Sequence, residues 1–432
     1  MEIIKDLLFG TPLPRMVKVR QNFLAPEVAN VAASLRDQFL KPGVGNLIKP
    51  GMRIAIAVGS RGVAEIPTLT RVTAEEIKRR GGQPFVVPAM GSHGGATAEG
   101  QKDVLANLGV TEATAGCEIV SSMEVVELGR LPAGLPVYMD KNAYGADGIV
   151  VINRVKAHTA FRGPNESGVV KMITIGLGKQ KGAESCHAYG FGVAAEFIPA
   201  MARITLAKAP ILFGVATVEN AYDHIAKVVA IPAAELLDAD QALLVESKAL
   251  MPRICFDPID VLVIDRIGKD ISGDGADPNI TGRYPTPFAS GGPRVSKMVI
   301  LDLTEATHGN ANGIGHAEFT TRKLFNKIDF PVTYANCLTS TVAIPGKIGL
   351  ILDDDREAIL FAIKTCNAMD LKQARVVRIP DTLRMREISI SESMLAEART
   401  KPEIEVVGAP AEMIFDEAGN LLEQAVEAPA AV

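Results

Sequence analysis

The chain has 432 residues, of which 47% are hydrophobic and 22% are charged, an ordinary composition for a globular protein. Its length exceeds the size at which a single hydrophobic core keeps growing, so we expect two domains. The formal net charge of −5 argues against a nucleic-acid-binding surface, because such a surface needs a basic face.

The compartment is predicted from the N-terminus, the apolar stretches and the cysteines. The first residues, MEIIKDLLFGTPLPR, hold acidic residues and a proline where a secretory signal needs a basic start and an unbroken apolar stretch. The longest apolar stretch, residues 206–218, contains Lys208 and Pro210 and is too short to span a bilayer. The five cysteines form no C-x-x-C pair, as is typical of reduced thiols. We therefore expect a cytoplasmic protein that binds neither membrane nor nucleic acid.

Taken in chain order, short strand patterns alternate with helical ones. Apolar, β-branched runs occur at residues 53–58 (RIAIAV), 84–90 (PFVVPAM) and 147–153 (DGIVVIN), and an amphipathic helical pattern covers residues 65–82. Such alternation predicts an α/β fold with mostly parallel sheets.

The alternation restarts near Pro252, which predicts a second α/β domain and an active-site cleft between the two. The expected divisions are residues 1–255 for the N-terminal domain, 256–395 for the C-terminal domain and 396–432 for a partly frayed C-terminal segment.

Three candidate functional residues follow predicted strands. In an open α/β sheet, ligands gather outside the carboxyl ends of the strands. Arg61 lies in GSRGVAEIP, a turn whose amides and guanidinium suit a carboxylate or phosphate. His93 lies in GSHGGAT, whose glycines leave room for a ligand, and His158 follows the third strand. The alternative is a surface arginine and two structural, hydrogen-bonded histidines.

The segment after His158 adds three further candidates. Lys171 lies in VVKMITI between apolar residues, where desolvation disfavours the ammonium form, as an amine nucleophile requires. GLGKQKG, residues 176–182, predicts a flexible basic turn in which Lys179 contacts an anion such as phosphate, and His187 closes the segment. Alternatively, Lys171 extends its ammonium group to water.

The second domain contains two long loops rich in small residues. Residues 269–294 form a loop of a length that is usually functional or disordered, and Lys269, Asp270 and Asn279 are its candidates for facing a shared cleft. His308 and His316 lie in the second loop, and we expect them to line the cleft. The alternative is a metal-binding pair, although their spacing matches no recognised pair of metal ligands.

Taken together, GSHGGAT, the Arg61 turn, AHTAFRGPNESGVVKM and CHAYG resemble the lactate racemase superfamily, whose members use a nickel-pincer nucleotide. The similarity covers most of the first 200 residues. It implies that Lys171 is joined to the cofactor through a thioamide and that His187 coordinates the nickel. It further implies that His93 and His158 are acid and base on opposite sides of the substrate, and that Arg61 lies in the active site.

The implied activity is an isomerase reaction, the racemisation or epimerisation of a 2-hydroxy acid. Removing a hydride from such a substrate needs a base for the hydroxyl proton and an acceptor for the hydride, and it gives a flat keto acid open to attack from either face. One histidine per face is the minimal arrangement. The cofactor supplies the hydride acceptor, while the protein supplies position and proton transfer. The implied partners are a small 2-hydroxy acid and the cofactor-synthesis enzymes.

The sequence also departs from the lactate enzymes. No aspartate precedes Arg61, the chain has no tryptophan, and the loop after His158 carries the extra polar residues Asn165 and Glu166. Lys269 matches the substrate-binding lysine of the second domain. The missing aspartate, the missing tryptophan and the extra polar loop residues favour a larger or more polar 2-hydroxy acid, such as a sugar acid, over lactate. Two alternatives remain, a zinc-dependent hydrolase that uses the histidines as ligands and a non-catalytic protein that binds a nucleotide or nickel.

Overall fold

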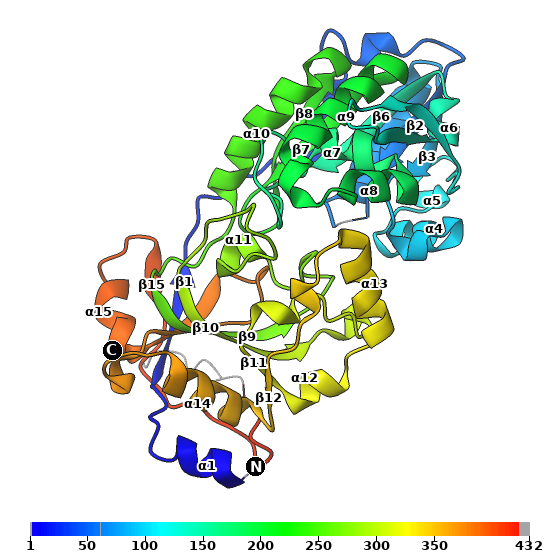
Figure 1. Cartoon of the computed structure of the whole chain (residues 1–432). Coiled ribbons are helices and arrows are strands. Elements are labelled where there is room, and N and C mark those ends of the chain that lie inside the picture. Colours follow the sequence, from blue (N-terminus) through cyan, green and yellow to red (C-terminus); the bar gives the residue numbers. More distant parts are fainter. Residues whose placement is uncertain (1, 61, 423–432) are drawn as a thin grey trace. The chain divides into compact units, whose positions relative to one another are not determined.

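The computed structural model describes residues 2–60 and 62–422. The chain forms two compact units, one of Ala25–Met251 and one of Met1–Leu24 with Pro252–Val432 (Figure 1). Each unit has helices around a sheet, and in both sheets most neighbouring strands are parallel. The expected α/β class is therefore confirmed. The unit of Ala25–Met251 ends four residues before the expected boundary at 255.

The sheet of the unit Ala25–Met251 has five strands in the order β3-β2-β6-β7-β8. All neighbouring strands are parallel except β7 and β8, which form an antiparallel pair at one edge. A separate antiparallel hairpin pairs β4 with β5. The strands are β2 (Arg53–Val58), β3 (Gln83–Pro88), β4 (Val125–Arg130), β5 (Pro136–Asp140), β6 (Gly148–Arg154), β7 (Ile211–Glu219) and β8 (Ile225–Pro232).

The helices of this unit alternate with its strands as the sequence pattern predicts. The longer ones are α2 (Val31–Gln38), α3 (Ile66–Arg79), α4 (Ala98–Asn107), α8 (Lys179–His187), α9 (Ala194–Lys208) and α10 (Leu236–Leu250). The short ones are α5 (Glu112–Ala115), α6 (Lys141–Tyr144), α7 (Val169–Lys171) and the π-helical turn η3 (Met172–Gly176), together with the 3₁₀ turns η1 (Gly45–Leu47), η2 (Gly94–Ala96), η4 (Phe191–Val193) and η5 (Ala233–Glu235).

Burial on both faces explains why the central strand β2 has an unbroken apolar sequence. Its residues 54–58 are fully buried. Ile54 and Ile56 share a core cluster with Leu69 and Val72 of α3. Because successive side chains of a strand point to opposite faces, Ala55 lies on the other face.

The second unit has an eight-stranded mixed sheet in the order β12-β11-β10-β9-β13-β14-β1-β15. The first five strands in this order, β12-β11-β10-β9-β13, are parallel to one another. The remaining pairs, β13 with β14, β14 with β1 and β1 with β15, are antiparallel. The strands are β1 (Met16–Gln21), β9 (Ile259–Ile267), β10 (Val295–Leu303), β11 (Phe319–Thr321), β12 (Leu350–Leu352), β13 (Val376–Ile379), β14 (Glu387–Ser391) and β15 (Ile404–Val406). The helices are α1 (Glu2–Leu8), α11 (Pro278–Thr281), α12 (Arg322–Asn326), α13 (Phe330–Ser340), α14 (Asp355–Thr365) and α15 (Leu395–Ala398).

Both ends of the chain correct the expected domain division. The first 24 residues belong to the C-terminal unit, because β1 lies between β14 and β15 and buries Val17 and Val19 completely. The segment 396–432 is not frayed up to Leu422, since β15 pairs with β1 and Phe415 bridges to Leu421. Residues 423–432 lie outside the described residues.

Candidate active site

The carboxyl ends of three parallel strands carry the first group of candidate residues. β2 is followed by Ser60, β3 by His93 and β6 by His158. β2 lies between β3 and β6, and the connection after β3 returns to the far side of β2, which is the topological switch point where α/β sheets bind ligands. Adjacent strands are about 4.8 Å apart, so the ends of β3 and β6 are roughly 10 Å apart. The fold therefore brings these three loops to one edge of one sheet.

His158 and Lys171 are in direct contact. The Lys171 Nζ lies 2.8 Å from His158 Nε2, and His158 Nδ1 accepts the Ala160 N–H at 3.0 Å. Because Nδ1 is an acceptor, the proton of the neutral ring is on Nε2. Nε2–H then donates to the lysine nitrogen, which accepts only as an uncharged amine. This arrangement is compatible with an uncharged amine at Lys171, the form that a nucleophile requires.

The helical segment that carries Lys171 is irregular. Lys171 ends α7 and is followed by the π-helical turn η3, a geometry that is often found at functional sites. A Cβ at Gly176, the last residue of η3, would lie 2.7 Å from the Ala89 carbonyl oxygen. The Gly176 carbonyl accepts the Gly91 N–H at 3.1 Å. Glycine thus allows the Lys171 segment to touch the loop that carries His93.

Aromatic contacts bring His187 close to His158. The ring of Phe191 is 5.7 Å from that of His158 and 5.3 Å from that of His187, centroid to centroid. Phe161 adds a second ring 4.5 Å from His158. His187, the last residue of α8, is half-buried, so its imidazole is accessible beside an apolar wall.

His93 is exposed and is oriented by the neighbouring loop. Its Nδ1 lies 2.5 Å from the Ser60 hydroxyl oxygen. A hydroxyl both donates and accepts, so this contact is compatible with the neutral and the charged imidazole. His93 can therefore change its protonation state without losing its partner.

Two acidic side chains behind the site anchor the loop between His158 and Lys171. Glu166 is 1% exposed, accepts the His158 N–H at 2.7 Å and pairs with Lys248 of α10 at 2.7 Å. Asp240, also of α10, is 1% exposed and accepts the Val170 N–H at 3.4 Å, immediately before Lys171. Burial raises the pKa of Asp240 to about 6.

This anchoring corrects one part of the sequence analysis. Asn165 and Glu166 were expected as polar groups of a longer loop that bears on the substrate. Both are 1% exposed, and Asn165 donates to the Asp240 carboxylate at 3.2 Å. Their partners are protein groups of the same unit, so their polarity does not argue for a polar substrate.

Lys179 differs from its expected role as an anion contact. It begins helix α8 rather than a flexible turn, and its side chain is completely buried. Its Nζ donates to the Pro88 carbonyl at 2.5 Å and to Gln101 Oε1 at 2.9 Å, and it lies 3.3 Å from the Asp140 carboxylate. The protein itself surrounds this ammonium group, which leaves it no surface to offer a phosphate.

Arg61, expected to bind the cofactor or the substrate carboxylate, lies outside the described residues. The loop that follows it is held by Glu219 at the end of β7, which accepts the Ala64 N–H at 2.7 Å. Glu219 also forms an ion pair with Arg154 at the end of β6.

The remaining candidates belong to the C-terminal unit. Lys269 Nζ donates to the Gly273 carbonyl at 2.5 Å, and Asp270 accepts the Thr304 hydroxyl at 2.5 Å. Asn279 donates to Asp277 in the first turn of α11. These contacts shape the loop after β9 within its own unit.

The two histidines of the other small-residue loop have different environments. His308 is exposed and has a positive φ of 48°, whereas His316 is buried. Burial lowers the pKa of His316, partly offset by Asp274. His316 is therefore expected to be uncharged at neutral pH. Among the residues that the structure describes, no group of three or more His, Cys, Asp or Glu side chains is arranged to hold a metal ion.

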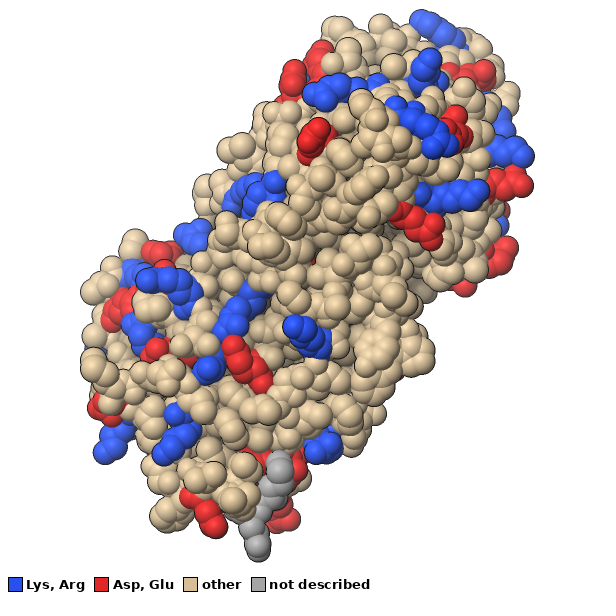
Figure 2. All heavy atoms as spheres, viewed as in Figure 1, with Lys and Arg blue, Asp and Glu red and all other residues tan. Residues whose placement is uncertain are grey.

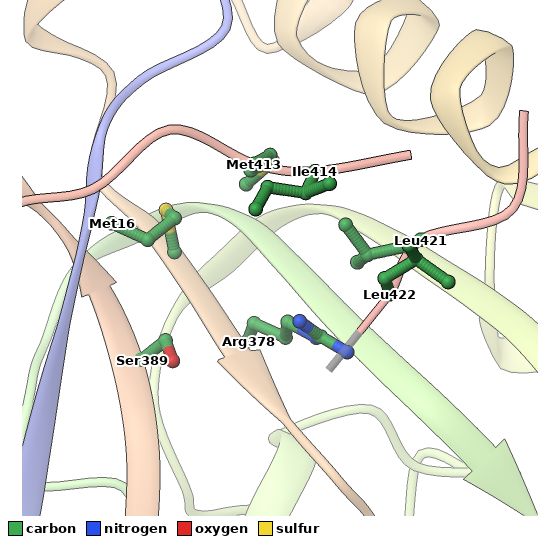
Figure 3. Close-up of a pocket in the computed structure, with 7 residues that line it drawn as sticks. All are labelled: Met16, Arg378, Ser389, Met413, Ile414, Leu421 and Leu422. Carbon is green, nitrogen blue, oxygen red and sulfur yellow. The ribbon is translucent and has the colours of Figure 1, made fainter. Parts of the chain in front are cut away.

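Two hollows in the structure lie away from the candidate residues. The one in Figure 3 has about 10 Å³, room for about one water, between Met16, Arg378 and the segment that holds Met413 and Leu421. A larger open hollow of about 590 Å³ lies beside β4 and is lined partly by Lys141 and Lys181. Neither contains a candidate side chain.

The distribution of surface charge and the length of the apolar helices are relevant to binding of polyanions and membranes. On the face shown in Figure 2, basic and acidic side chains are interspersed. Within residues 2–60 and 62–422, no single helix is long and apolar enough to cross a membrane. The segments Lys179–His187 and Phe191–Lys208 reach that length and apolarity only as a pair bent by 87°.

Several residues that shape the site were not singled out from the sequence. Ser60 directly precedes Arg61, so the same turn pointed to it. Gln101, Asp240 and Phe191 carry no local signal, because their roles depend on contacts with distant segments.

The fold and the site define an α/β protein that gathers histidines and an amine at the carboxyl edge of a parallel sheet. Residues 14–196 match the family model described as the lactate racemase N-terminal domain. These residues therefore contain a domain of the lactate racemase N-terminal type.

A solved lactate racemase structure has the same fold. The lactate racemase apoprotein from Thermoanaerobacterium thermosaccharolyticum matches with a TM-score of 0.50 at 13% identity, over 85% of this chain and 94% of that chain. A protein from Thermotoga maritima matches with a TM-score of 0.47 at 14% identity, over 65% and 72% of the two chains. No curated protein matches the sequence.

Proposed function

We propose that the protein is a racemase or epimerase of 2-hydroxy acids that uses a nickel-pincer nucleotide. The observation that carries the proposal is the contact between Lys171 Nζ and His158 Nε2 at 2.8 Å, with Ala160 fixing the ring tautomer. A hydrogen bond donated to the lysine nitrogen stabilises the uncharged amine, which suits a nucleophile and not a lysine that only carries surface charge.

The residues present fit this cofactor. Lys171 offers an uncharged amine for covalent attachment, and His187, later in the same helical segment, offers a half-buried imidazole as a metal ligand. When bound, the cofactor supplies the acceptor for the substrate hydride. Lys179 is not part of this set, because its ammonium group is enclosed by protein.

His93 is the residue best arranged to take the hydroxyl proton of the substrate. Its Nδ1 keeps the Ser60 contact in both protonation states, so a proton added to the ring needs no rearrangement. Its place after β3, two strands from β6, separates it from His158 across the switch point.

His158 becomes available to the substrate once Lys171 is attached. With Lys171 attached through an amide-type nitrogen, that nitrogen would no longer accept a hydrogen bond, and Nε2–H would be available to donate to a substrate oxygen. To become charged, the ring must also take a proton at Nδ1, which requires the Ala160 N–H to move away. Proton transfer by His158 therefore includes a small shift of residues 158–160.

The substrate proposed is a 2-hydroxy acid larger than lactate, with a sugar acid as one example. Arg61 and Lys269 are the proposed partners of its carboxylate and polar groups. The support for a larger substrate is the lack of tryptophan and of an aspartate before Arg61, and no longer the loop residues Asn165 and Glu166.

The test is to produce the protein together with the cofactor-synthesis enzymes and to screen 2-hydroxy acids for loss of stereochemical purity. We expect stoichiometric nickel, a mass adduct on Lys171 and scrambling of at least one acid. Lys171→Met should lose the adduct and the activity, whereas the matched control Lys208→Met, at the exposed end of α9, should keep both. Stoichiometric zinc without an adduct would overturn the proposal.

A further inference from the structure

Lys179 holds a buried ammonium group that the proposed reaction does not use. It begins α8, the helix that ends with His187, and it contacts three separate segments. These are the end of β3 at Pro88, helix α4 at Gln101 and the end of β5 at Asp140. Burial lowers the pKa of Lys179 and raises that of Asp140, and each charge partly offsets the change in the other.

Gln101 transmits this contact to the His93 loop. Its Oε1 accepts from Lys179 at 2.9 Å, while its Nε2 donates to the carbonyls of Gly91 at 2.9 Å and His93 at 3.2 Å. The Lys179 ammonium group, paired with Asp140, is only a donor and a carbonyl is only an acceptor, so a single orientation of the amide satisfies all three contacts. Lys179 therefore fixes the orientation in which Gln101 holds the loop.

A buried ion pair is a poor device for stability alone. Two charges removed from water often contribute no more than well-packed apolar groups of the same size. The directional contacts of this pair, in contrast, link the strand before His93, the loop that carries His93 and the helix that carries His187.

We propose that Lys179 and Asp140 act through Gln101 as positioning residues that set the His93 loop relative to helix α8. The inference rests on the proposed function, since it assigns His93 the proton transfer. This positioning role explains why the Lys179 side chain, at the start of α8, is buried in the protein instead of contacting a ligand.

The test compares Lys179→Met, Asp140→Asn and the double variant, with Lys208→Met as the control. Asparagine keeps the capping contact that Asp140 makes with the Ala143 N–H and removes only the charge. Lys179→Met leaves the aspartate buried without its cation, so we expect the melting temperature to fall by about 10 °C. The double variant has neither charge and should recover most of this loss.

The expected result that separates positioning from stability is in the double variant. Its kcat, measured per nickel-loaded molecule, should remain about 10- to 100-fold below that of the wild type, with little change in KM. Hydrogen exchange of residues 91–97 should be faster than in the wild type. A double variant with recovered stability, wild-type kcat and unchanged exchange would overturn the inference.

Gln101→Met is a second variant that leaves the ion pair intact and removes only the link. It should also lower kcat and speed exchange in residues 91–97, and wild-type values for both would count against the inference. If the wild-type protein binds no nickel and scrambles no hydroxy acid, the proposed function fails. The exchange measurement still decides whether this network holds the loop.

Discussion

At the scale of single residues, the site depends on side chains whose chemistry is set by one or two neighbours. The proposed role of Lys171 as an amine nucleophile depends on its contact with His158 Nε2, while the other ring nitrogen of His158 accepts the Ala160 N–H. The sequence alone predicted the role of Lys171 from its apolar flanks. The structure adds a contact with a histidine thirteen residues earlier, which the local sequence does not reveal.

Asp240 leads to a prediction about pH. Its pKa is raised to about 6 by burial, against an ordinary value near 4 in the unfolded chain. The folded chain therefore binds the Asp240 proton more strongly than the unfolded chain does. The stability that the protonated carboxyl contributes is fully present below pH 4 and is lost as the pH rises through 6. A difference of about 2 between the pKa values of the folded and unfolded chains corresponds to roughly 3 kcal/mol.

Asp240→Asn should remove that dependence. Relative to the wild type, the variant should gain roughly 3 kcal/mol in free energy of unfolding between pH 4 and pH 8, as measured by urea denaturation. The comparison across pH cancels any fixed penalty from the amide group beside Asn165. A constant difference between the two proteins over this range would contradict the assignment.

At the scale of elements, the strands that build the site could be predicted and the segment that carries Lys171 could not. RIAIAV forms β2 with the expected bounds because a strand buried on both faces needs an unbroken apolar run. The π-helical turn η3 has no such pattern, since a single widened turn changes neither the composition nor the period of its sequence. For the same reason GLGKQKG was expected as a turn, although α8 begins within it.

Two glycines in this segment should respond in opposite ways to alanine. In Gly176→Ala, the new Cβ would lie 2.5 Å from the Met172 sulfur and 2.7 Å from a backbone oxygen. We expect a loss of about 1–3 kcal/mol in free energy of unfolding from overpacking. In Gly182→Ala, inside α8, the closest contact is an ordinary 3.4 Å, so we expect no loss or a gain of up to ~1 kcal/mol. Urea denaturation of both variants checks the contrast, and equal losses would argue against the close approach at η3.

At the scale of the whole molecule, the N-terminal strand β1 pairs with strands that are far from it in sequence. β1 pairs with β14 and β15, more than 360 residues later in the chain, and is separated from them by the entire unit Ala25–Met251. The sequence pattern of MVKVRQ gives no partner, so a division read along the chain assigned it to the first domain. Strand pairing of this range follows from complementary buried faces, which a single sequence does not reveal.

Val19→Asp tests this use of the N-terminus. Val19 is completely buried in a core cluster with Ile388 and Ile390 of β14. A carboxylate there should destabilise the unit that contains β9 to β15 by several kcal/mol, at least ~3, because a buried charge without a partner is strongly unfavourable. Native-state hydrogen exchange should lose protection in β9 and β14 while β2 and β6 remain protected. Lys18→Asp, on the neighbouring partly exposed position of the same strand, controls for the added charge. Equal loss in β2 and β6 would mean that the two units unfold as one, whereas unchanged protection in β14 would mean that β1 does not stabilise that sheet.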